Sequence, residues 1–410
     1  MKKHRARAQD VAKGIMIIGV ILFHCYLMTF ENHAEAIQNF NITMAIIPYI
    51  MGAFFFYTGY NYKINGKSAK ENILKRAKQL LIPLVLAFVI SATLISAMEL
   101  AFDHSNVGAT FQAIGNSLLY GLMSEPLALM IHFPQSGGVV FELILALGLL
   151  WFLYALFICS VFFFLLVNYT NKKLSTLISV VIGLLVLAFC LGQFVGTYLP
   201  YTVQSYPVIL AIMLTASYLR QKHFIHKKLE GKKDIILHGI NMVLAEAIIV
   251  LTCLFCYYQF GSVTTGSLPG GMFDAKLKGF DAFIAYIFAI LGTYFIHMLC
   301  RLIKHIPVVG NCLKWVGHHS AIFYLFHPVF LNLTAIVIFQ KKVPWGRAQA
   351  LFYVAVVVLL LTGVCLLMDL IFKKRHPEVN IEEEIHKLEA PEEPETPEEN
   401  GAPIEKQNVQ

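Results

Sequence analysis

Ten long apolar segments dominate this chain of 410 residues and leave few ways for it to fold. Most of them are long enough to cross the hydrocarbon core of a bilayer as a helix. A helix satisfies its own backbone hydrogen bonds in lipid, so helical spans are expected and open sheets are excluded. A composition of 57% hydrophobic and 14% charged residues excludes an ordinary soluble domain. The segments lie at about 15–30, 42–60, 80–102, 139–167, 174–193, 203–219, 235–260, 280–300, 318–339 and 350–372.

The basic residues support this count of spans. If the N-terminus is cytoplasmic, all but five of the 32 Lys and Arg residues fall on the cytoplasmic side, as the positive-inside rule requires. The long segment 103–138 contains no Lys or Arg and is expected on the opposite side. We therefore predict an all-α, polytopic integral membrane protein of the plasma membrane, with ten transmembrane helices and both termini cytoplasmic. The net charge of +7 follows from this asymmetry and needs no nucleic-acid partner.

The C-terminal segment has a different composition. Residues 376–410 are rich in Pro and Glu and poor in apolar side chains, which predicts a disordered cytoplasmic tail. Residues 1–375 then form one membrane domain. No soluble catalytic domain is attached, so any chemistry has to take place among the helices. No internal repeat is evident, which weakens the case for an inverted-repeat transporter.

Three ionisable residues share one face of the first span. Lys13 and His24 are eleven residues apart, about three helical turns, and Asp10 lies one turn before Lys13. Ionisable groups in a spanning helix are costly and usually face a protein interior or a water-filled path. An imidazole can take a proton from a hydroxyl near neutral pH, which is the task of a general base in acyl transfer. We predict a catalytic His24 assisted by Lys13 and Asp10; a histidine that only packs against a neighbouring helix is the alternative.

A cluster of cations, Lys75, Arg76 and Lys78, precedes the third span. Lys and Arg side chains bind phosphate groups through charge-assisted hydrogen bonds. The cluster is therefore a candidate for holding the phosphates of a ligand. The alternative is the ordinary basic flank of a membrane helix.

The fourth and ninth spans carry candidates for substrate contacts. Glu142 lies in the fourth apolar segment, ahead of Trp151, and a carboxylate there needs a partner, for which His24 and His327 are both candidates. Tyr324 and His327 lie in the ninth span, with His327 at about the depth expected for His24. No compact spacing of metal ligands is present, so no metal site is predicted.

Together these motifs resemble acyltransferase family 3, the ten-helix membrane O-acyltransferases of bacterial cell-envelope carbohydrates. The first span resembles the family's opening, in which Asp-x-x-Arg/Lys-Gly is followed by a histidine, and the resemblance covers about residues 7–372. The matching residues are Asp10, Lys13, Gly14 and His24 in the first span, Thr58 and Gly59 in the second, Leu81-Ile82-Pro83 after the basic cluster, Leu150-Trp151-Phe152-Leu153 in the fourth, and Ser320, Tyr324 and His327 in the ninth.

The resemblance implies that acyl-CoA, with acetyl-CoA the expected form, binds from the cytoplasm. His24 would take part in moving the acyl group to a hydroxyl of an extracytoplasmic or lipid-linked sugar. Lys13 and the basic cluster would meet the CoA phosphates. Two positions depart from the family pattern: Lys13 stands where arginine is commoner, which loses bidentate pairing, and Gln79 stands where a second arginine often follows Arg76.

We therefore predict a membrane O-acyltransferase that O-acetylates an envelope polysaccharide or glycolipid. The main alternative is a transporter or flippase of an envelope glycan precursor, in which the same polar residues line a translocation path. A membrane scaffold without chemistry is a third possibility. Acyl-CoA hydrolysis or stabilisation by CoA would favour the enzyme, whereas substrate flux without acyl transfer would favour the transporter.

Overall fold

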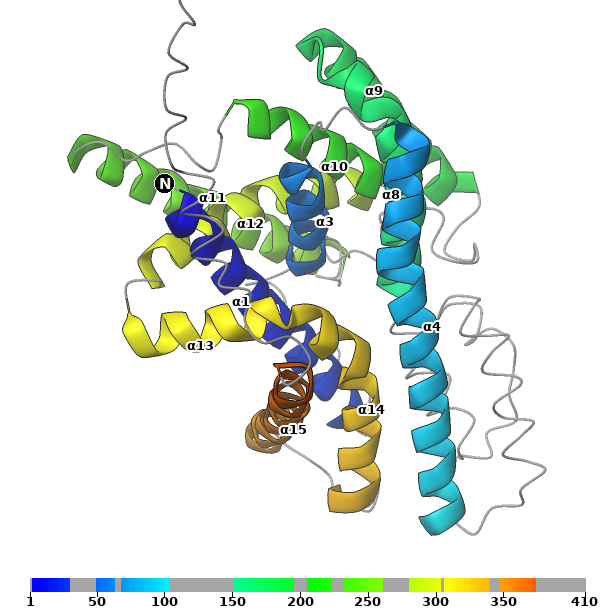
Figure 1. Cartoon of the computed structure of the whole chain (residues 1–410). Coiled ribbons are helices and arrows are strands. Elements are labelled where there is room, and N and C mark those ends of the chain that lie inside the picture. The colour runs from blue at the N-terminus through cyan, green and yellow to red at the C-terminus, as the bar shows by residue number, and fades with distance from the viewer. Residues whose placement is uncertain are drawn as a thin grey trace, which may run out of the picture. The chain divides into compact units, whose positions relative to one another are not determined.

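The computed structural model describes residues 2–29, 49–62, 68–102, 151–194, 205–222, 232–260, 280–303, 306–339 and 347–373 (Figure 1). Every regular element in these segments is a helix. The chain forms two compact units, residues 1–363 and 364–410, and the contacts among α1 to α14 lie within the first. The helices are α1 (Lys2–Thr29), α3 (Ile50–Asn61), α4 (Ala69–Phe102), α8 (Trp151–Thr170), α9 (Leu174–Phe194), α10 (Tyr206–Gln221), α11 (Lys232–Phe260), α12 (Asp281–Ile303), α13 (Pro307–His318), α14 (Ser320–Phe339) and α15 (Arg347–Lys373).

Each of the ten predicted spans overlaps a helix in the described residues. Five of these helices are long and apolar enough to cross a membrane, which confirms an all-α, multi-pass membrane protein. The count of ten spans and the cytoplasmic side of the termini stay predictions, since α3 and α10 are only 12 and 16 residues long. The five spanning segments are Phe152–Thr170, Leu174–Gly192, Lys233–Phe255, Asp281–Ile303 and Phe352–Leu370.

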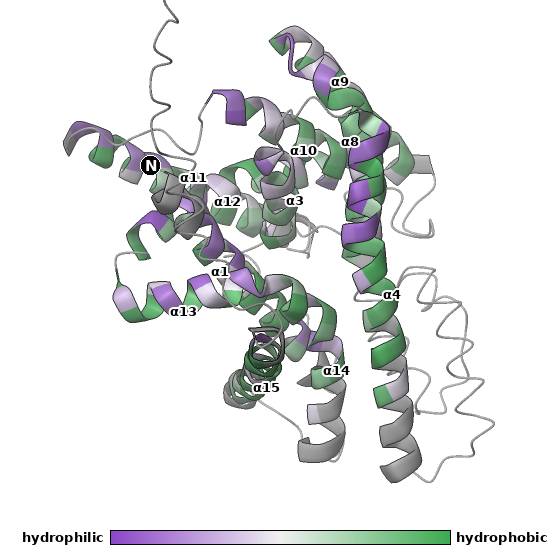
Figure 2. Ribbon diagram, in the orientation of Figure 1, coloured by the Kyte–Doolittle hydropathy of each residue, from purple (hydrophilic) through white to green (hydrophobic). Residues whose placement is uncertain are grey.

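The helix α13 was not among the predicted elements. It begins with Pro307, whose fixed φ and missing N–H suit the first turn of a helix. Apolar and polar residues alternate along it (Figure 2), and most of its side chains are exposed. It therefore differs from the spans around it, which are apolar along most of their length.

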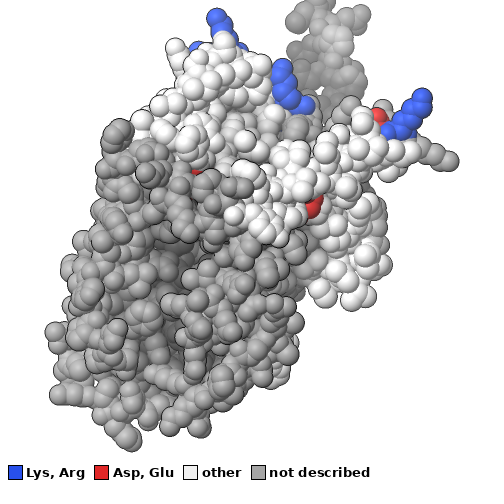
Figure 3. All heavy atoms as spheres, turned by 180° about the vertical axis from the view of Figure 1, so that it is seen from behind, with Lys and Arg blue, Asp and Glu red and all other residues white. Residues whose placement is uncertain are grey.

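Large apolar side chains cover the outward faces of the long helices. Val85 of α4, Ile182 of α9 and Leu251 of α11 are each more than half exposed. Lipid tails solvate such faces without cost, whereas water would not. In Figure 3 the visible Lys and Arg side chains stand along the upper edge of the described surface, above a mostly uncharged face. A surface embedded in a membrane requires this separation of charged residues at the edge from an uncharged face.

The short helices α3 and α10 form the core of the first unit. Residues Pro207 to Ser217 of α10 are all buried, and α3 packs against both α10 and α12. A helix that is apolar on all sides is stable only when neighbours surround it. Gly59 allows the close contact of α3 with α10, because a methyl group there would collide with the backbone of Met213.

A second close contact, between α1 and α13, positions the first residues of the candidate site. Gly14 of α1 lies against the carbonyl of Leu313, and Gly317 of α13 lies against the carbonyl of Asp10. No side chain would fit at either glycine without moving a backbone. The crossing therefore holds the Asp10–Lys13 turn of α1 against the C-terminal end of α13.

Candidate functional site

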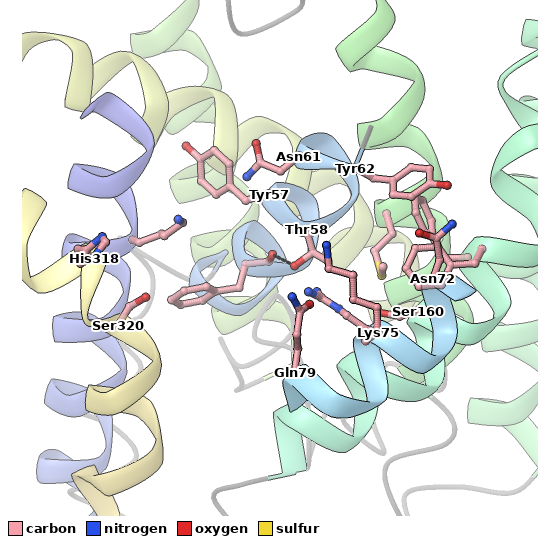
Figure 4. A pocket seen from close by; sticks show the side chains of 17 residues that line it. Tyr57, Thr58, Asn61, Tyr62, Asn72, Lys75, Gln79, Ser160, His318 and Ser320 are labelled. Carbon is pink, nitrogen blue, oxygen red and sulfur yellow. Dashed lines mark hydrogen bonds between the residues drawn. The ribbon is translucent and has the colours of Figure 1, made fainter. Parts of the chain in front are cut away.

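A cavity of about 540 Å³ lies between α1, α3, α4, α8, α10 and the α13–α14 junction (Figure 4). Its volume is typical of pockets that bind small molecules and cofactors. The cations Lys13, Lys75 and Arg76 line it, whereas no Asp or Glu is among the described residues of its wall. The cavity therefore suits an anionic ligand, and we refer to it as the cationic cavity.

Lys13 reaches this cavity from α1 and is held by Asp10. The ammonium nitrogen of Lys13 lies 3.2 Å from Oδ1 of Asp10, three residues earlier on the same helix. This confirms that Asp10 contacts Lys13, as their spacing predicted. Asp10 is not among the residues that line the cavity. The carboxylate thus orients the ammonium and leaves the cavity wall positive.

The first turns of α4 present a polar stripe to the cavity. A reciprocal capping box fixes where α4 begins: the Ser68 amide donates to Glu71 Oε2 at 2.8 Å, and the Glu71 amide donates to Ser68 Oγ at 3.3 Å. Four residues spaced three or four apart then share one helical face and line the cavity: Asn72, Lys75, Arg76 and Gln79.

Lys78 lies on a different face of α4, about 110° from the centre of this stripe at 100° per residue. It is exposed and is not among the residues of the cavity wall. Of the three cations in the predicted cluster, the structure thus brings only Lys75 and Arg76 to the cavity. The position of Lys78 outside the wall gives no support to its predicted phosphate contact, which the Lys78→Ala variant tests.

Arg76 is the most enclosed cation of the stripe. Lys75 is exposed, whereas Arg76 is half-buried. The Arg76 Nε atom is buried and has no hydrogen-bond partner among the described residues. An unsatisfied donor on a buried cation costs free energy, and an anionic ligand would supply the missing acceptor.

Tyr57 and Thr58 line the cavity from α3. The Tyr57 hydroxyl lies 3.1 Å from His297 Nδ1 on α12, which anchors the ring. The Thr58 hydroxyl donates to the Phe54 carbonyl of its own helix at 3.0 Å. Both side chains are therefore held by the protein, and they give the wall a fixed shape.

A second cavity, of about 200 Å³, adjoins the first. The two share Phe54, Gln79 and Ser320, and the rest of the second wall is mostly apolar. It lies between α3, α4, α8 and α14, and Tyr324 lines it from α14. We refer to it as the apolar cavity. Its other lining residues are Met51, Leu80, Pro83, Phe152, Leu153, Leu156, Ala321 and Leu325.

The predicted His24 meets His327 next to this apolar cavity. The ring centroids of His24 and His327 are 5.2 Å apart, and the rings are stacked with an angle of 27° between their planes. The Tyr324 ring, which lines the apolar cavity, lies 5.6 Å from that of His327. His327 therefore lies at the depth of His24, as predicted. The two adjoining cavities thus extend as far as Tyr324, whose ring contacts His327, although neither imidazole is among the described residues that line them.

Two predicted substrate residues cannot be placed. Glu142 and the Trp151 side chain lie outside the described residues, as do segments 103–138 and 376–410. Their predicted roles stay predictions. Within the described residues, no group of three His, Cys, Asp or Glu side chains could hold a metal ion.

Several polar residues of the cationic cavity were not predicted. Asn72, Ser160 and His318 line it beside the predicted cations. Asn72 could have been found, since it stands at helical spacing from Lys75, Arg76 and Gln79. Ser160 and His318 come from distant helices, and no local pattern marks them.

Comparison with known proteins shows that residues 8–369 match a family model described as an acyltransferase domain. The match covers far more than half of the chain and includes all the residues of both cavities and of the imidazole pair. No curated protein and no solved structure matches the chain.

Proposed function

Since the chain belongs to acyltransferase family 3 and is thus an acyltransferase, we propose that it moves an acyl group from acyl-CoA to a hydroxyl of a cell-envelope glycan or glycolipid. Acetyl-CoA is the expected donor, and the plasma membrane is the expected location. The observation that carries this proposal is the pair of adjoining cavities, one lined by cations and the other by Tyr324, which contacts the His24–His327 pair.

The cationic cavity would hold the nucleotide end of CoA. CoA carries a diphosphate and a 3′-phosphate, and Lys13, Lys75 and Arg76 converge on one cavity from two helices. Phosphates bind best where several cations act together and no carboxylate competes. On this proposal the cavity faces the cytoplasm, where acyl-CoA is made.

The apolar cavity would then receive the acyl end of the donor. Its wall carries few polar groups, so it excludes water from the thioester. The thioester would approach the imidazole pair past Tyr324. His24 would act there as general base or would carry the acyl group covalently, while Lys13 neutralises a donor phosphate.

The donor proposal can be tested on the purified protein in lipid nanodiscs. We expect CoA to raise the melting temperature, 3′-dephospho-CoA to raise it less, and pantetheine to have little effect. Arg76→Ala should reduce the shift given by CoA, whereas Lys78→Ala on the same helix serves as the matched control. If CoA and pantetheine have equal effects, the cationic cavity does not bind phosphate.

The acceptor proposal is tested by mass spectrometry of envelope glycans from cells with and without the intact protein. Loss of an O-acyl group with the protein supports acyl transfer to that glycan. Transport of a glycan precursor by the purified protein, with no acyl transfer from acyl-CoA to any glycan, would instead favour the transporter.

A further inference from the structure

A proline inside α14 exposes a backbone carbonyl beside the imidazole pair. Pro328 has no N–H, so the carbonyl of Tyr324, four residues earlier, loses its usual helical donor. The Nδ1 atom of His327 lies 2.7 Å from that carbonyl oxygen. A carbonyl only accepts hydrogen bonds, so Nδ1 carries the hydrogen. Pro328 thereby fixes the tautomer of the histidine that precedes it.

This tautomer leaves the lone pair of the neutral ring on Nε2. His327 is fully buried, and its Nε2 atom has no hydrogen-bond partner within the part of the chain that the structure describes. A buried acceptor without a donor is costly and uncommon in folded proteins. A substrate group that brings a hydrogen would remove this cost.

The surroundings of Nε2 fit such a substrate. The His24 ring stacks on the face of His327, whereas the Nε2 lone pair lies in the ring plane and so is not directed at His24. Tyr324, one turn earlier, connects His327 to the apolar cavity. The unpartnered base thus stands close to where the proposed thioester would end.

We propose that His327 is a second catalytic residue, whose Nε2 takes the proton from the acceptor hydroxyl. The inference rests on the proposed acyl transfer. As the O–H bond breaks, the oxygen bonds to the acyl carbon and the C–S bond of the thioester breaks. The proton then passes from Nε2 to the thiolate of the departing CoA. If His24 carries the acyl group first, the C–S bond has already broken, and attack by the acceptor oxygen breaks the C–N bond to His24 instead. The acylated ring cannot act as base, so His327 takes the proton of the hydroxyl and passes it to the thiolate.

His327→Asn separates this role from a structural one. An asparagine amide places an N–H where Nδ1–H stood, so it keeps the hydrogen bond to the Tyr324 carbonyl, but it has no atom equivalent to Nε2. We expect normal membrane insertion and a normal melting-temperature shift with CoA, with acyl transfer reduced about 10²-fold or more. His238→Asn is the matched control, because His238 bonds Tyr294 of α12 and lines neither cavity.

Pro328→Ala tests the tautomer independently. Alanine restores the N–H that pairs with the Tyr324 carbonyl, and the His327 ring can then adopt either tautomer. The helix should be at least as stable as before. Acyl transfer should nevertheless fall several-fold, with the CoA-induced shift unchanged.

The outcomes separate this inference from the proposed function. Near-normal acyl transfer by a membrane-inserted His327→Asn protein would show that His327 only donates the hydrogen bond that the Tyr324 carbonyl lacks because of Pro328. If that variant does not insert, Pro328→Ala decides: lowered transfer supports the inference, and unchanged transfer overturns it. If the unaltered protein neither responds to CoA nor transfers acyl groups, the proposed function fails and the inference fails with it.

Discussion

The cationic cavity and the imidazole pair both place ionisable side chains among apolar helices, but they do so in opposite ways. In the cavity, Lys75 is exposed and Lys13 is partly exposed, and Lys13 already forms an ion pair with Asp10 behind the wall. At the pair, His327 is fully buried and the His24 ring stacks on it. Two imidazolium ions at 5.2 Å would repel each other strongly there, so the pair carries at most one positive charge.

This difference separates binding from chemistry. A set of permanent charges in an open cavity stabilises the ground state and the transition state of a bound donor equally, which affects affinity. A neutral imidazole in a dry site is suited to take up a proton for a short time, which affects rate. Substitutions in the two regions should therefore change different kinetic constants.

The largest effect is expected at the imidazole pair. His24→Ala should lower acyl transfer about 10²–10⁴-fold, the usual contribution of a general base. His24→Gln should fail as well, because an amide keeps hydrogen bonding but can neither take up a proton nor carry the acyl group. The measurement is acyl content of the envelope glycan, normalised to membrane-inserted protein, together with the CoA-induced shift, which should not change.

A histidine that only packs predicts the reverse pattern for this residue. His24→Gln would then be close to normal, and His24→Ala would be impaired through lower protein abundance. Full acylation by a well-expressed His24→Gln protein would show that the His24 imidazole takes no part in the reaction. The proposed difference between the cationic cavity and the imidazole pair would then be wrong.

The next largest effect is expected for the enclosed cation of the cavity. Removing a charge-assisted hydrogen bond typically costs about 1.5–3 kcal/mol, so Arg76→Ala should weaken acyl-CoA binding roughly 10- to 100-fold. The kcat at saturating donor should change much less. Lys78→Ala, an equal loss of charge on another face of α4, should leave KM near normal. Equal effects of the two substitutions would mean that only the net charge of the helix matters.

A smaller effect is expected at Lys13, where arginine is commoner in the family. Lys13→Ala should raise KM for acyl-CoA about tenfold, since one charge contact is lost. Lys13→Arg should retain more activity than Lys13→Ala, because a phosphate contact depends mainly on charge. Titration of acyl-CoA with the three proteins checks this order. An unchanged acyl-CoA dependence in both Lys13→Ala and Arg76→Ala would make these cations determinants of topology alone.

The helices could be predicted from the sequence because the bilayer fixes the length of an apolar span. The helix α13 was not predicted from span length, because it is short and mixes exposed polar and apolar residues. Contacts within one helix could be predicted too, and the Asp10–Lys13 pair follows from helical spacing alone. The common depth of His24 and His327 followed in the same way from their positions in two spans.

Contacts between distant helices could not be predicted. The crossing of α1 with α13 depends on Gly14 and Gly317, which are small residues of the kind found at many helix contacts. The apolar cavity is a result of packing, and no local pattern marks it. The His327-Pro328 pair is different, because a histidine before a proline within an apolar segment could have indicated a fixed tautomer.

The smallest effect is expected for Asp10→Asn, and it tests how the charges of the cavity are arranged. Asp10 lies outside the cavity wall, and its contact with Lys13 is partly exposed, with side chains 20% and 33% accessible. Ion pairs of this kind contribute only about 0.2–1 kcal/mol. Asparagine can still accept a hydrogen bond from Lys13, so the ammonium should keep its direction while the cavity becomes more positive. We therefore expect KM for acyl-CoA to change less than about fivefold, with kcat unchanged, in steady-state assays at low ionic strength. A loss of kcat as large as that of His24→Ala would instead place Asp10 in the proton chemistry, and the separation of a binding region from a reacting region would no longer hold.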